Sequence, residues 1–545
     1  MAGINEKHFI EELRFDIKEN DLLKARLVLE HLDKIDEKIQ RQAFSELSSA
    51  GEGFVIPLIA EVLAIRPDFG EAFPALKETL YSKALFGAEV FINLLINESN
   101  PGRKAVLIGI AGEMRLEEAT SVLIEVLNDE EDEKILKSAI ETLGRIGDPN
   151  AISALSEYLY SWNAELIVTA IHALARIESP TAFQRLSERI GADQDLDLII
   201  LEAFAASQSP EALEKLNDTL GSHHANVRTE GKKRLIEIGD KAVPVLLKNL
   251  LHHDPDLLIH TLNALGEIGD ETAVSAIGKL LHNDPRDPNV RFAAYEALGM
   301  LPVGRGAFTL AAGLEDPVAN VRSAAAKAID HNYNMVLSAG LKNIIGDEGS
   351  QVKGIIEAII ESQCNNIFLD LVETEDFNEY ASEYLKKQAH PDIHSHFSAL
   401  LEENDYKDMA GKISRERAKE QKTGIKVFAV DDSKMILSIY RSVLHNLGCE
   451  SHLFEFPAEA IEKVREEKPD VILTDLNMPD ISGIGLTETV REWFGKEEMP
   501  IVMVTTQNES QDNDAAYAAG VNAIIHKPFN EEQIGAAMSE YVDLA

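Results

Sequence analysis

The feature that most constrains this chain is a segment that recurs about every 30 residues through much of its first 400 positions. The related segments TLGRIGD, ALARIES, AFAASQS, RLIEIGD and ALGEIGD end at Asp148, Ser179, Ser209, Asp240 and Asp270. Successive ends are 31, 30, 31 and 30 residues apart. A fixed period of this length is typical of proteins built from stacked copies of one small unit.

Each repeat contains two apolar patterns with helical spacing, and a turn separates them. Gly269-Asp270 is one such turn sequence. A single helical hairpin cannot bury its own apolar stripe, so neighbouring hairpins must stack and share one continuous core. We therefore predict a multidomain protein that begins with an all-α superhelical solenoid over residues 1–402, with the clearest repeats at 105–362. The apolar positions of one unit are Ile259, Leu262, Leu265 and Ile268, then Val274, Ile277 and Leu281.

Three stretches precede Ala-rich helices and share a motif: HANVR (224–228), DPNVR (287–291) and EDPVANVR (315–322). These units resemble the HEAT repeat, in particular the short HEAT-like form of bilin lyases. The resemblance implies that Asp and Arg pair between adjacent units. Because solenoids commonly use an extended concave surface for binding, we expect the array to bind a protein partner. A rigid spacer is the alternative. A chromophore-handling role, as in bilin lyases, would need chemistry-bearing residues that the repeats do not offer.

The charge of the chain constrains its partners. The formal net charge is −41, and residues 424–545 alone carry 22 acidic and 9 basic side chains, so both parts of the chain are acidic. Phosphates bind basic surfaces, so we expect no nucleic-acid partner and no attachment to anionic membranes.

The cysteines and the N-terminus bear on the compartment. The only two cysteines, Cys364 and Cys449, are far apart, and the charged N-terminus has no apolar signal core. No apolar run reaches the ~18 residues that a membrane span requires. We therefore expect a cytoplasmic protein without direct membrane insertion.

Histidines are the one candidate for a metal site within the repeats. His390, His394 and His396 lie in AHPDIHSHF, but no cysteine or carboxylate pattern accompanies them. Surface histidines are the favoured interpretation. We expect the same of the pairs at 223–224 and 252–253, which fall in turns between repeats.

The composition changes between residues 403 and 424. Apolar residues become rare in ENDYKDMAGKISRERAKEQKTG, which predicts a charged linker. Basic residues gather in one part of it: Lys412, Arg415, Arg417, Lys419 and Lys422.

From residue 425 onward short apolar runs alternate with helical patterns. The expected strands are KVFAV, ESHLFEF, VILTD, IVMVTT and AIIHKPF, and each precedes a segment with helical spacing. Five strands alternating with five helices predict an α/β doubly wound domain with a five-stranded parallel sheet, as in flavodoxin-like folds, over residues 425–545.

Charged and polar residues stand where these buried strands end. Asp431 and Asp432 follow the first strand and Asp475 the third, while Thr505 and Lys527 end the fourth and fifth. Parallel strands meet at one edge, where such sheets place their sites. Carboxylates that converge there repel one another, and a hard dication such as Mg²⁺ removes the repulsion. With a lysine and a hydroxyl beside them, these groups suit phosphoryl transfer to a carboxylate.

The stretches VFAVDDSKMI, VILTDLNMPDISGIGL, PIVMVTTQ and HKPF resemble the receiver domain of two-component response regulators, similar to the single-domain chemotaxis regulators. The resemblance implies that Asp475 is the phosphoacceptor and that Thr505 and Lys527 contact the phosphoryl group. It further implies Mg²⁺ bound by Asp431, Asp432, Asp475 and the backbone carbonyl of Asn477, and a cis Lys527-Pro528 peptide. Ile524 stands where many receivers carry an aromatic switch residue.

The sequence therefore predicts a response regulator that is not an enzyme in its own right. It would catalyse only its own Mg²⁺-dependent phosphorylation and autodephosphorylation. A sensor histidine kinase would phosphorylate Asp475, and the HEAT-like array would change its hold on an unknown protein partner, in a chemotaxis-like pathway. The alternative is a constitutive scaffold or docking protein whose receiver acts as a phosphate sink.

Overall fold

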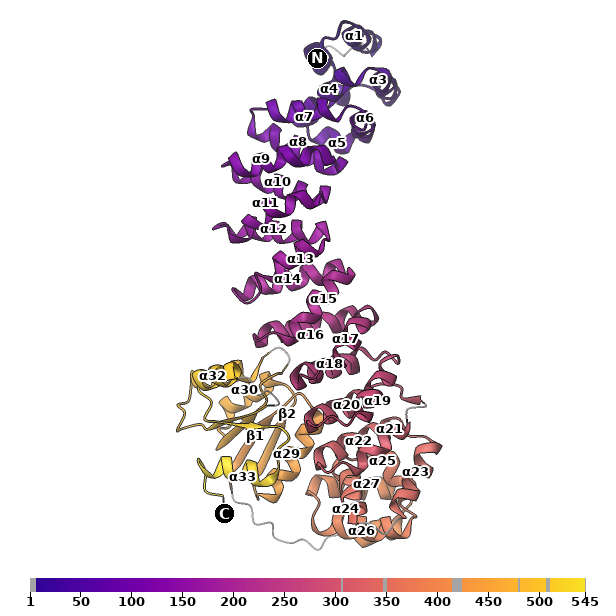
Figure 1. Ribbon diagram of the computed structural model, residues 1–545, viewed down its shortest axis with the longest axis vertical. Coiled ribbons are helices and arrows are strands. Elements are labelled where there is room, and N and C mark those ends of the chain that lie inside the picture. The colour runs from indigo at the N-terminus through magenta and orange to yellow at the C-terminus, as the bar shows by residue number, and fades with distance from the viewer. Residues whose placement is uncertain are drawn as a thin grey trace. The chain divides into compact units, whose positions relative to one another are not determined.

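The computed structural model describes residues 6–304, 307–346, 350–413, 424–478, 481–505 and 510–544. By its internal contacts the chain divides into two compact units, residues 1–215 and 216–545. Repeat helices make up the first, whereas the second contains repeat helices and an α/β domain (Figure 1).

Unit 1 is built from helices that pack as successive hairpins. Local signals fix the helix ends: Asp132 caps the first turn of α10 by accepting from the amides of Lys134 and Ile135, and Gly147 ends it at a φ of 81°. The helices are α1 Glu6–Glu19, α2 Leu22–Leu29, α3 Glu37–Ser49, α4 Glu52–Ile65, α5 Asp68–Ala72, α6 Pro74–Ala84, α7 Ala88–Asn97, α8 Pro101–Met114, α9 Thr120–Asp129, α10 Glu133–Ile146, α11 Ile152–Glu157, α12 Ala164–Ile177, α13 Pro180–Ser187, α14 Gln194–Ser207 and α15 Pro210–Asp218, which crosses the unit boundary.

The repeats of unit 2 continue the same pattern up to the α/β domain. One layer is formed by α16, α18, α20, α22 and α24, and each of these helices packs on the next. The helices are α16 Ala225–Ile238, α17 Val243–Asn249, α18 Pro255–Ile268, α19 Ala273–His282, α20 Pro288–Met300, α21 Ala307–Ala312, α22 Ala319–His331, α23 Met335–Ile345, α24 Ser350–Glu361, α25 Asn365–Leu371, α26 Glu375–Lys387, α27 Pro391–Glu403 and α28 Lys407–Ile413. The predicted helical hairpins are confirmed.

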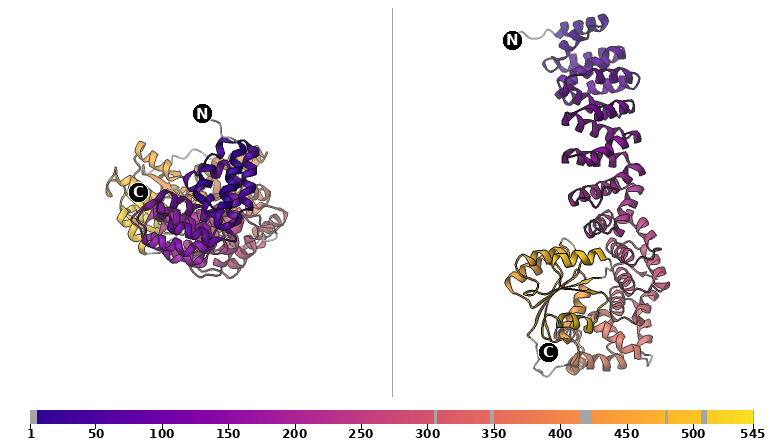
Figure 2. Two further views of the ribbon diagram at one scale, coloured as in Figure 1. Left: turned by 90° about the horizontal axis from the view of Figure 1, so that it is seen from above. Right: turned by 60° about the vertical axis from the view of Figure 1, so that its left-hand side comes forward.

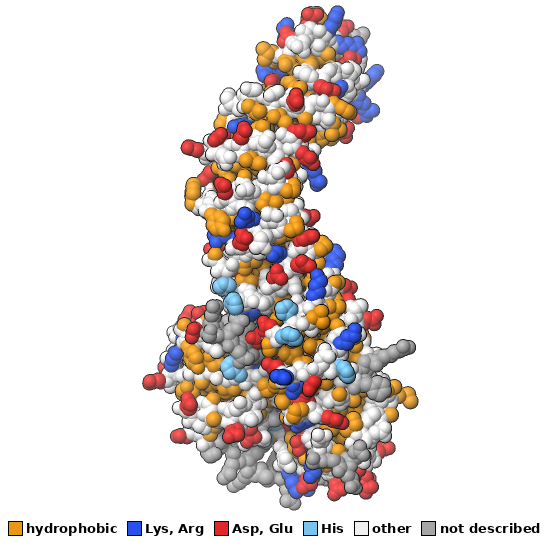
Figure 3. Space-filling model, in the orientation of Figure 1, with side chains coloured by type: hydrophobic (Ala, Val, Ile, Leu, Met, Phe, Trp, Pro, Cys, Tyr) orange, Lys and Arg blue, Asp and Glu red, His pale blue; other side chains and the backbone are white. Residues whose placement is uncertain are grey.

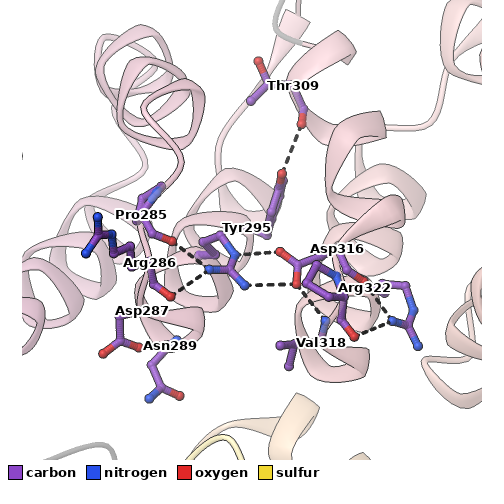
Figure 4. Close-up of polar contacts among 11 residues, drawn as sticks. Pro285, Arg286, Asp287, Asn289, Tyr295, Thr309, Asp316, Val318 and Arg322 are labelled. Atoms are coloured by element: carbon purple, nitrogen blue, oxygen red, sulfur yellow. Dashed lines mark hydrogen bonds and ion pairs between the residues drawn. The ribbon is translucent and has the colours of Figure 1, made fainter.

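An arginine and an aspartate join two adjacent repeats in the way that the HEAT resemblance implies. Arg291 on α20 donates to both carboxylate oxygens of Asp316, at 2.6 Å (Nε to Oδ2) and 3.2 Å (Nη2 to Oδ1) (Figure 4). Asp316 in turn accepts from the amide of Val318, at the start of α22, and its carbonyl accepts from Arg322. Both side chains of the pair are largely buried, at 13% and 8% exposed.

Replacing Asp316 with alanine is expected to destabilise unit 2 by about 3 kcal/mol, because a buried guanidinium would be left without its partner. Urea unfolding of the full chain measures the loss. Glu165→Ala is the matched control, since it removes an exposed ion pair with Lys137 and should change stability little. Equal effects of the two substitutions would contradict a structural role for the buried pair.

The α/β domain has five parallel strands in the order β2-β1-β3-β4-β5 (Figures 1 and 2). This confirms the predicted doubly wound fold. The strands are β1 Lys426–Val430, β2 Glu450–Phe454, β3 Val471–Thr474, β4 Ile501–Thr505 and β5 Ala523–His526, and the helices are α29 Lys434–Asn446, α30 Pro457–Glu466, α31 Gly483–Arg491, α32 Ser510–Ala519 and α33 Glu531–Ser539.

Apolar side chains cover both faces of the sheet, as buried parallel strands require. On one face α29 and α33 contribute Tyr440, Leu444 and Met538 to a core with the strands. On the other face α30 and α31 contribute Val464 and Leu486. This packing fixes the strand ends, and the side chains that follow them, at one edge.

The predicted linker lies only partly within the described residues. Its first part contains α28, whose Met409 and Ile413 are buried, and α28 packs on α26 and α27. Residues 414–423 lie outside the described residues, so the linker and the domain bounds of 402 and 425 stay predictions.

The three histidines near residue 390 do not converge. His394 Nε2 lies 2.8 Å from the carbonyl of Ile413, and His396 Nε2 lies 2.7 Å from Asn365 Oδ1. His390 caps α27 by accepting from the amide of Asp392. Throughout the described ranges no group of three or more His, Cys, Asp or Glu side chains is placed to hold a metal ion.

In the part of the chain that the structure describes, no single helix has the length and apolar character of a membrane span. Helices α6 and α7 reach the length and apolar composition of a membrane span only when they are taken together, and the pair is bent by 109°.

Candidate phosphorylation site

The parallel sheet brings the predicted site residues to one edge. Asp431 and Asp432 follow β1 and Asp475 follows β3, whereas Thr505 is the last residue of β4 and Lys527 follows β5. Asp431 and Thr505 are almost completely buried, at 0% and 2% exposed. The geometry therefore gathers these charged side chains from strands that are separate in sequence into one cluster, which we call the acidic pocket.

Lys527 occupies the centre of this acidic pocket. Its Nζ donates to Asp431 Oδ2 at 2.6 Å and forms an ion pair with Asp475 Oδ1 at 2.9 Å. Burial by itself lowers the pKa of Lys527, but the two carboxylates more than offset this, and its pKa lies well above the ordinary value. Lys527 is therefore a fixed cation, shared between two carboxylates.

One ammonium cannot neutralise three carboxylates. Burial, followed by the charges of Asp475 and Asp432, raises the pKa of Asp431 to about 8 although Lys527 opposes the shift. Loss of surrounding water and the charge of Asp475 raise the pKa of Asp432 to about 6. The acidic pocket therefore carries a charge imbalance that a bound cation would relieve.

Backbone amides hold the carboxylates in place. The amide of Ser433 donates to Asp431 Oδ1 at 3.0 Å, and that of Asn477 donates to Asp475 Oδ2 at 3.1 Å. The amide of Lys527 donates to the carbonyl of Thr505 at 2.8 Å, which ties the ends of β4 and β5 together. The Lys527-Pro528 peptide is cis, as the resemblance implied.

The donor set suits Mg²⁺ more than a transition metal. Mg²⁺ binds oxygen ligands, keeps several waters, and needs only one or two protein carboxylates. Asp431 and Asp432 are such donors, and Asp475 with the backbone carbonyl of Asn477 follows the neighbouring strand β3. Burial first, and then the neighbouring carboxylates, raise the pKa of Asp431 and of Asp432. The residues present therefore fit the predicted ion, although Lys527 rather than a third carboxylate lies closest to Asp431 and Asp475.

Sequence reasoning missed three residues around the acidic pocket. Glu296 on α20 accepts from Ser433 Oγ at 2.9 Å, and burial raises its pKa to about 7. Asn289, also on α20, donates from Nδ2 to the carbonyl of Lys527 at 2.5 Å. Neither residue belongs to the α/β domain, so no local motif could have indicated them.

The third missed residue is Tyr440. It is fully buried on α29 and stacks on Phe529 at 4.8 Å between ring centroids. Burial raises its pKa well above the ordinary value, and the charges of Lys527, Asp431 and Asp475 also act on it. Its hydroxyl makes no hydrogen bond to any described residue. The apolar spacing of α29 marked this position as core but not as a neighbour of the charges.

Ile524, on β5, stands in the place of an aromatic residue. It is half-buried and packs against Leu476, Met503 and Val521 on the side of the sheet covered by α32. An aliphatic side chain therefore fills this part of the core.

Gly483, the first residue of α31, packs against the backbone beneath Asp475. A Cβ atom there would lie 2.0 Å from the carbonyl oxygen of Asp475, which cannot move without moving the site. We expect Gly483→Ala to destabilise the domain by about 2 kcal/mol or more. Gly495→Ala is the control, because open space surrounds Gly495. Thermal unfolding of the two variants checks this, and equal transitions would contradict it.

Comparison with known proteins identifies both parts of the chain. Residues 427–539 match the family model described as the response regulator receiver domain, and residues 88–167 and 243–330 match HEAT repeats. The chemotaxis protein CheY1 of Helicobacter pylori is 37% identical over 110 residues, which cover 20% of this chain and 89% of that protein.

A second curated relative agrees with this match. A CheY homologue of Campylobacter jejuni is also 37% identical over 110 residues, covering 20% of this chain and 85% of that protein. Among solved structures, the receiver domain of the sensor histidine kinase PA1611 from Pseudomonas aeruginosa is 22% identical and covers 22% of this chain and 98% of its own, with a TM-score of 0.21. It is described with a magnesium ion coordinated in its active-site cleft.

Proposed function

Since this chain belongs, through residues 427–539, to the response regulator receiver family, we propose that it is a response regulator phosphorylated on Asp475 by a sensor histidine kinase. The observation that carries the proposal is the ion pair of Lys527 with both Asp431 and Asp475 at the edge of the sheet. We place this activity in the cytoplasm. The chain would act in signalling, with its own phosphorylation and dephosphorylation as its only chemistry.

In the proposed reaction a carboxylate oxygen of Asp475 attacks the phosphorus of a phosphohistidine. The new O–P bond forms as the P–N bond breaks, and the imidazole leaves with a proton from solvent. Lys527 balances charge on the phosphoryl oxygens, and the Thr505 hydroxyl donates to one of them. When bound by Asp431, Asp432, Asp475 and the Asn477 carbonyl, Mg²⁺ would supply further stabilisation of that charge.

We assign the output to protein binding by the repeats. Stacked helical repeats commonly serve as binding surfaces, and unit 1 presents two exposed aromatic residues in one turn, Tyr160 at 66% and Trp162 at 88% exposure. On the face drawn in Figure 3, basic side chains are scattered among acidic ones, which favours a protein partner over a nucleic acid.

A capture experiment tests the function and its output together. The tagged full chain, as wild type and Asp475→Ala, is incubated with Mg²⁺ with and without acetyl phosphate, and co-purifying proteins are quantified. We expect a partner whose capture by the wild type changes at least fivefold with acetyl phosphate and whose capture by the variant does not. Equal capture in all four conditions would favour the constitutive scaffold instead.

A further inference from the structure

Helix α29 of the receiver is buried on two sides. One side packs in the core of the receiver, and the opposite side packs against the repeat helices of unit 2. Ile436, Leu437, Tyr440 and Leu444 point into the receiver core. The opposite side carries polar residues, which a sequence pattern assigns to solvent. In the structure that polar side lies against the repeat helices.

The contacts run along the whole length of α29. Ser438 Oγ donates to the carbonyl of Glu361, the last residue of α24, at 2.9 Å, and Ser442 Oγ donates to the carboxylate of the same residue. Further contacts are Ser362 Oγ to the sulfur of Met435 at 4.0 Å, and the ring of His390 against that of His445 at 4.7 Å. The spacing of positions 435, 438, 442 and 445 is that of one helical face.

The N-terminal end of this interface reaches the acidic pocket. Asn289 and Glu296 are seven residues apart on α20, so they lie on the same face two turns apart. Asn289 donates to the carbonyl of Lys527, and Glu296 accepts from Ser433. Between them Phe292 packs against the receiver core. The repeats therefore touch the receiver at two of the three backbone segments that carry its charged residues, those after β1 and β5.

Asn289 and Glu296 each contact a residue that itself contacts a carboxylate of the acidic pocket. The ammonium of Lys527 is shared by Asp431 and Asp475, and the amide of Ser433 donates to Asp431. A phosphoryl group on Asp475 adds up to two negative charges and three acceptor oxygens, which compete for the same ammonium. Any shift of Lys527 toward that group acts on the carbonyl that Asn289 holds.

We propose that α20 forms one wall of the acidic pocket, with Asn289 and Glu296 as positioning residues for Lys527 and Ser433. Phosphorylation of Asp475 then loosens the contact of α29 with α20 and α24. The inference rests on the proposed function, because it takes Asp475 as the acceptor. It adds that phosphorylation of Asp475 acts on the repeats through the side of α29 that packs against them.

Hydrogen–deuterium exchange of the full chain tests this, with beryllofluoride and Mg²⁺ as the phosphoryl mimic. We expect amides of α24 and α29 in the wild type to exchange at least fivefold faster with the mimic. In Glu296→Ala and Asn289→Ala, the same amides should exchange this fast even when the mimic is absent. Glu296→Gln keeps an acceptor for Ser433 and should behave as the wild type. Glu271→Ala, an exposed repeat position, is the control for a general loss of stability.

Fluorine NMR of bound beryllofluoride separates the possible failures. If the mimic binds and exchange in α24 and α29 is unchanged, the coupling is refuted while the proposed function survives. If the mimic does not bind, the proposed function fails. In that case the variants still test whether α20 forms a wall of the acidic pocket. Equal exchange rates of the α24 and α29 amides in Glu296→Ala and Glu296→Gln would refute that role.

Discussion

A chain in which asparagine replaces Asp475 is expected to incorporate at least 100-fold less phosphoryl label from acetyl phosphate than the wild type. The amide has no anionic oxygen to attack phosphorus, and Asp431 cannot take its place. Asp431 is 0% exposed and is hydrogen-bonded to Lys527 and Ser433, so its oxygens are not free to reach a donor. Acid-stable and hydroxylamine-labile label, followed by mass spectrometry, distinguishes an acyl phosphate on Asp475 from other products.

Asp543→Asn serves as the control for this experiment, because Asp543 is an exposed carboxylate of the same domain. Label incorporation at the wild-type rate in Asp475→Asn would show that another residue accepts the phosphoryl group. Folding is checked separately by the thermal transition, which should stay within a few degrees of the wild type, since the isosteric amide keeps the shape of the side chain.

The architecture could be predicted from sequence because both domains carry local, periodic signals. The 30-residue period and its turns predicted stacked hairpins, and the Asp316–Arg291 pair followed from the repeat motif. Apolar strands that end in Asp431, Asp475 and Lys527 predicted one charged edge, since parallel strands must bring their carboxyl ends together. The position of a charged residue at the carboxyl end of a strand is therefore enough to predict that it belongs to such a site.

The wall formed by α20 could not be predicted, because it depends on packing between distant segments. Asn289 and Glu296 occupy helix positions where polar residues ordinarily face water, and nothing local separates them from other such residues. The same holds for Ser438 and Ser442, whose polarity suggested a solvated face of α29. These side chains form contacts only because the receiver packs against the repeat helices.

This docking also changes where a partner of the repeats is to be sought. A protein that binds the surfaces of α22 and α24 would compete with the α29 face of the receiver, which packs on both helices. Phosphorylation that loosens α29 would therefore expose a surface within unit 2, whereas a partner of unit 1 could bind at the exposed Trp162. Capture with Trp162→Ala separates the two cases, because only a partner of unit 1 should be lost.

Binding of Mg²⁺ to the full chain is expected to strengthen by about tenfold per pH unit between pH 6 and 8 and to level off above. In the metal-free state burial raises the pKa of Asp431 to about 8, and loss of water and Asp475 raise that of Asp432 to about 6. Because the ion binds ionised carboxylates, protons compete with it below these pKa values, and each ion that binds releases a proton. Titration calorimetry in buffers of different ionisation enthalpy counts the protons released.

Asp432→Asn should weaken Mg²⁺ binding by about 100-fold or more, since a charged oxygen ligand becomes a neutral one. It should also remove the part of the pH dependence near pH 6 and move the part that belongs to Asp431 to lower pH, because the charge of Asp432 no longer raises the pKa of Asp431. Asp543→Asn should change neither. An affinity that is flat from pH 6 to 8, with no protons released, would mean that Lys527 already balances the carboxylates, and that the charge imbalance is not what draws a cation to this edge of the sheet.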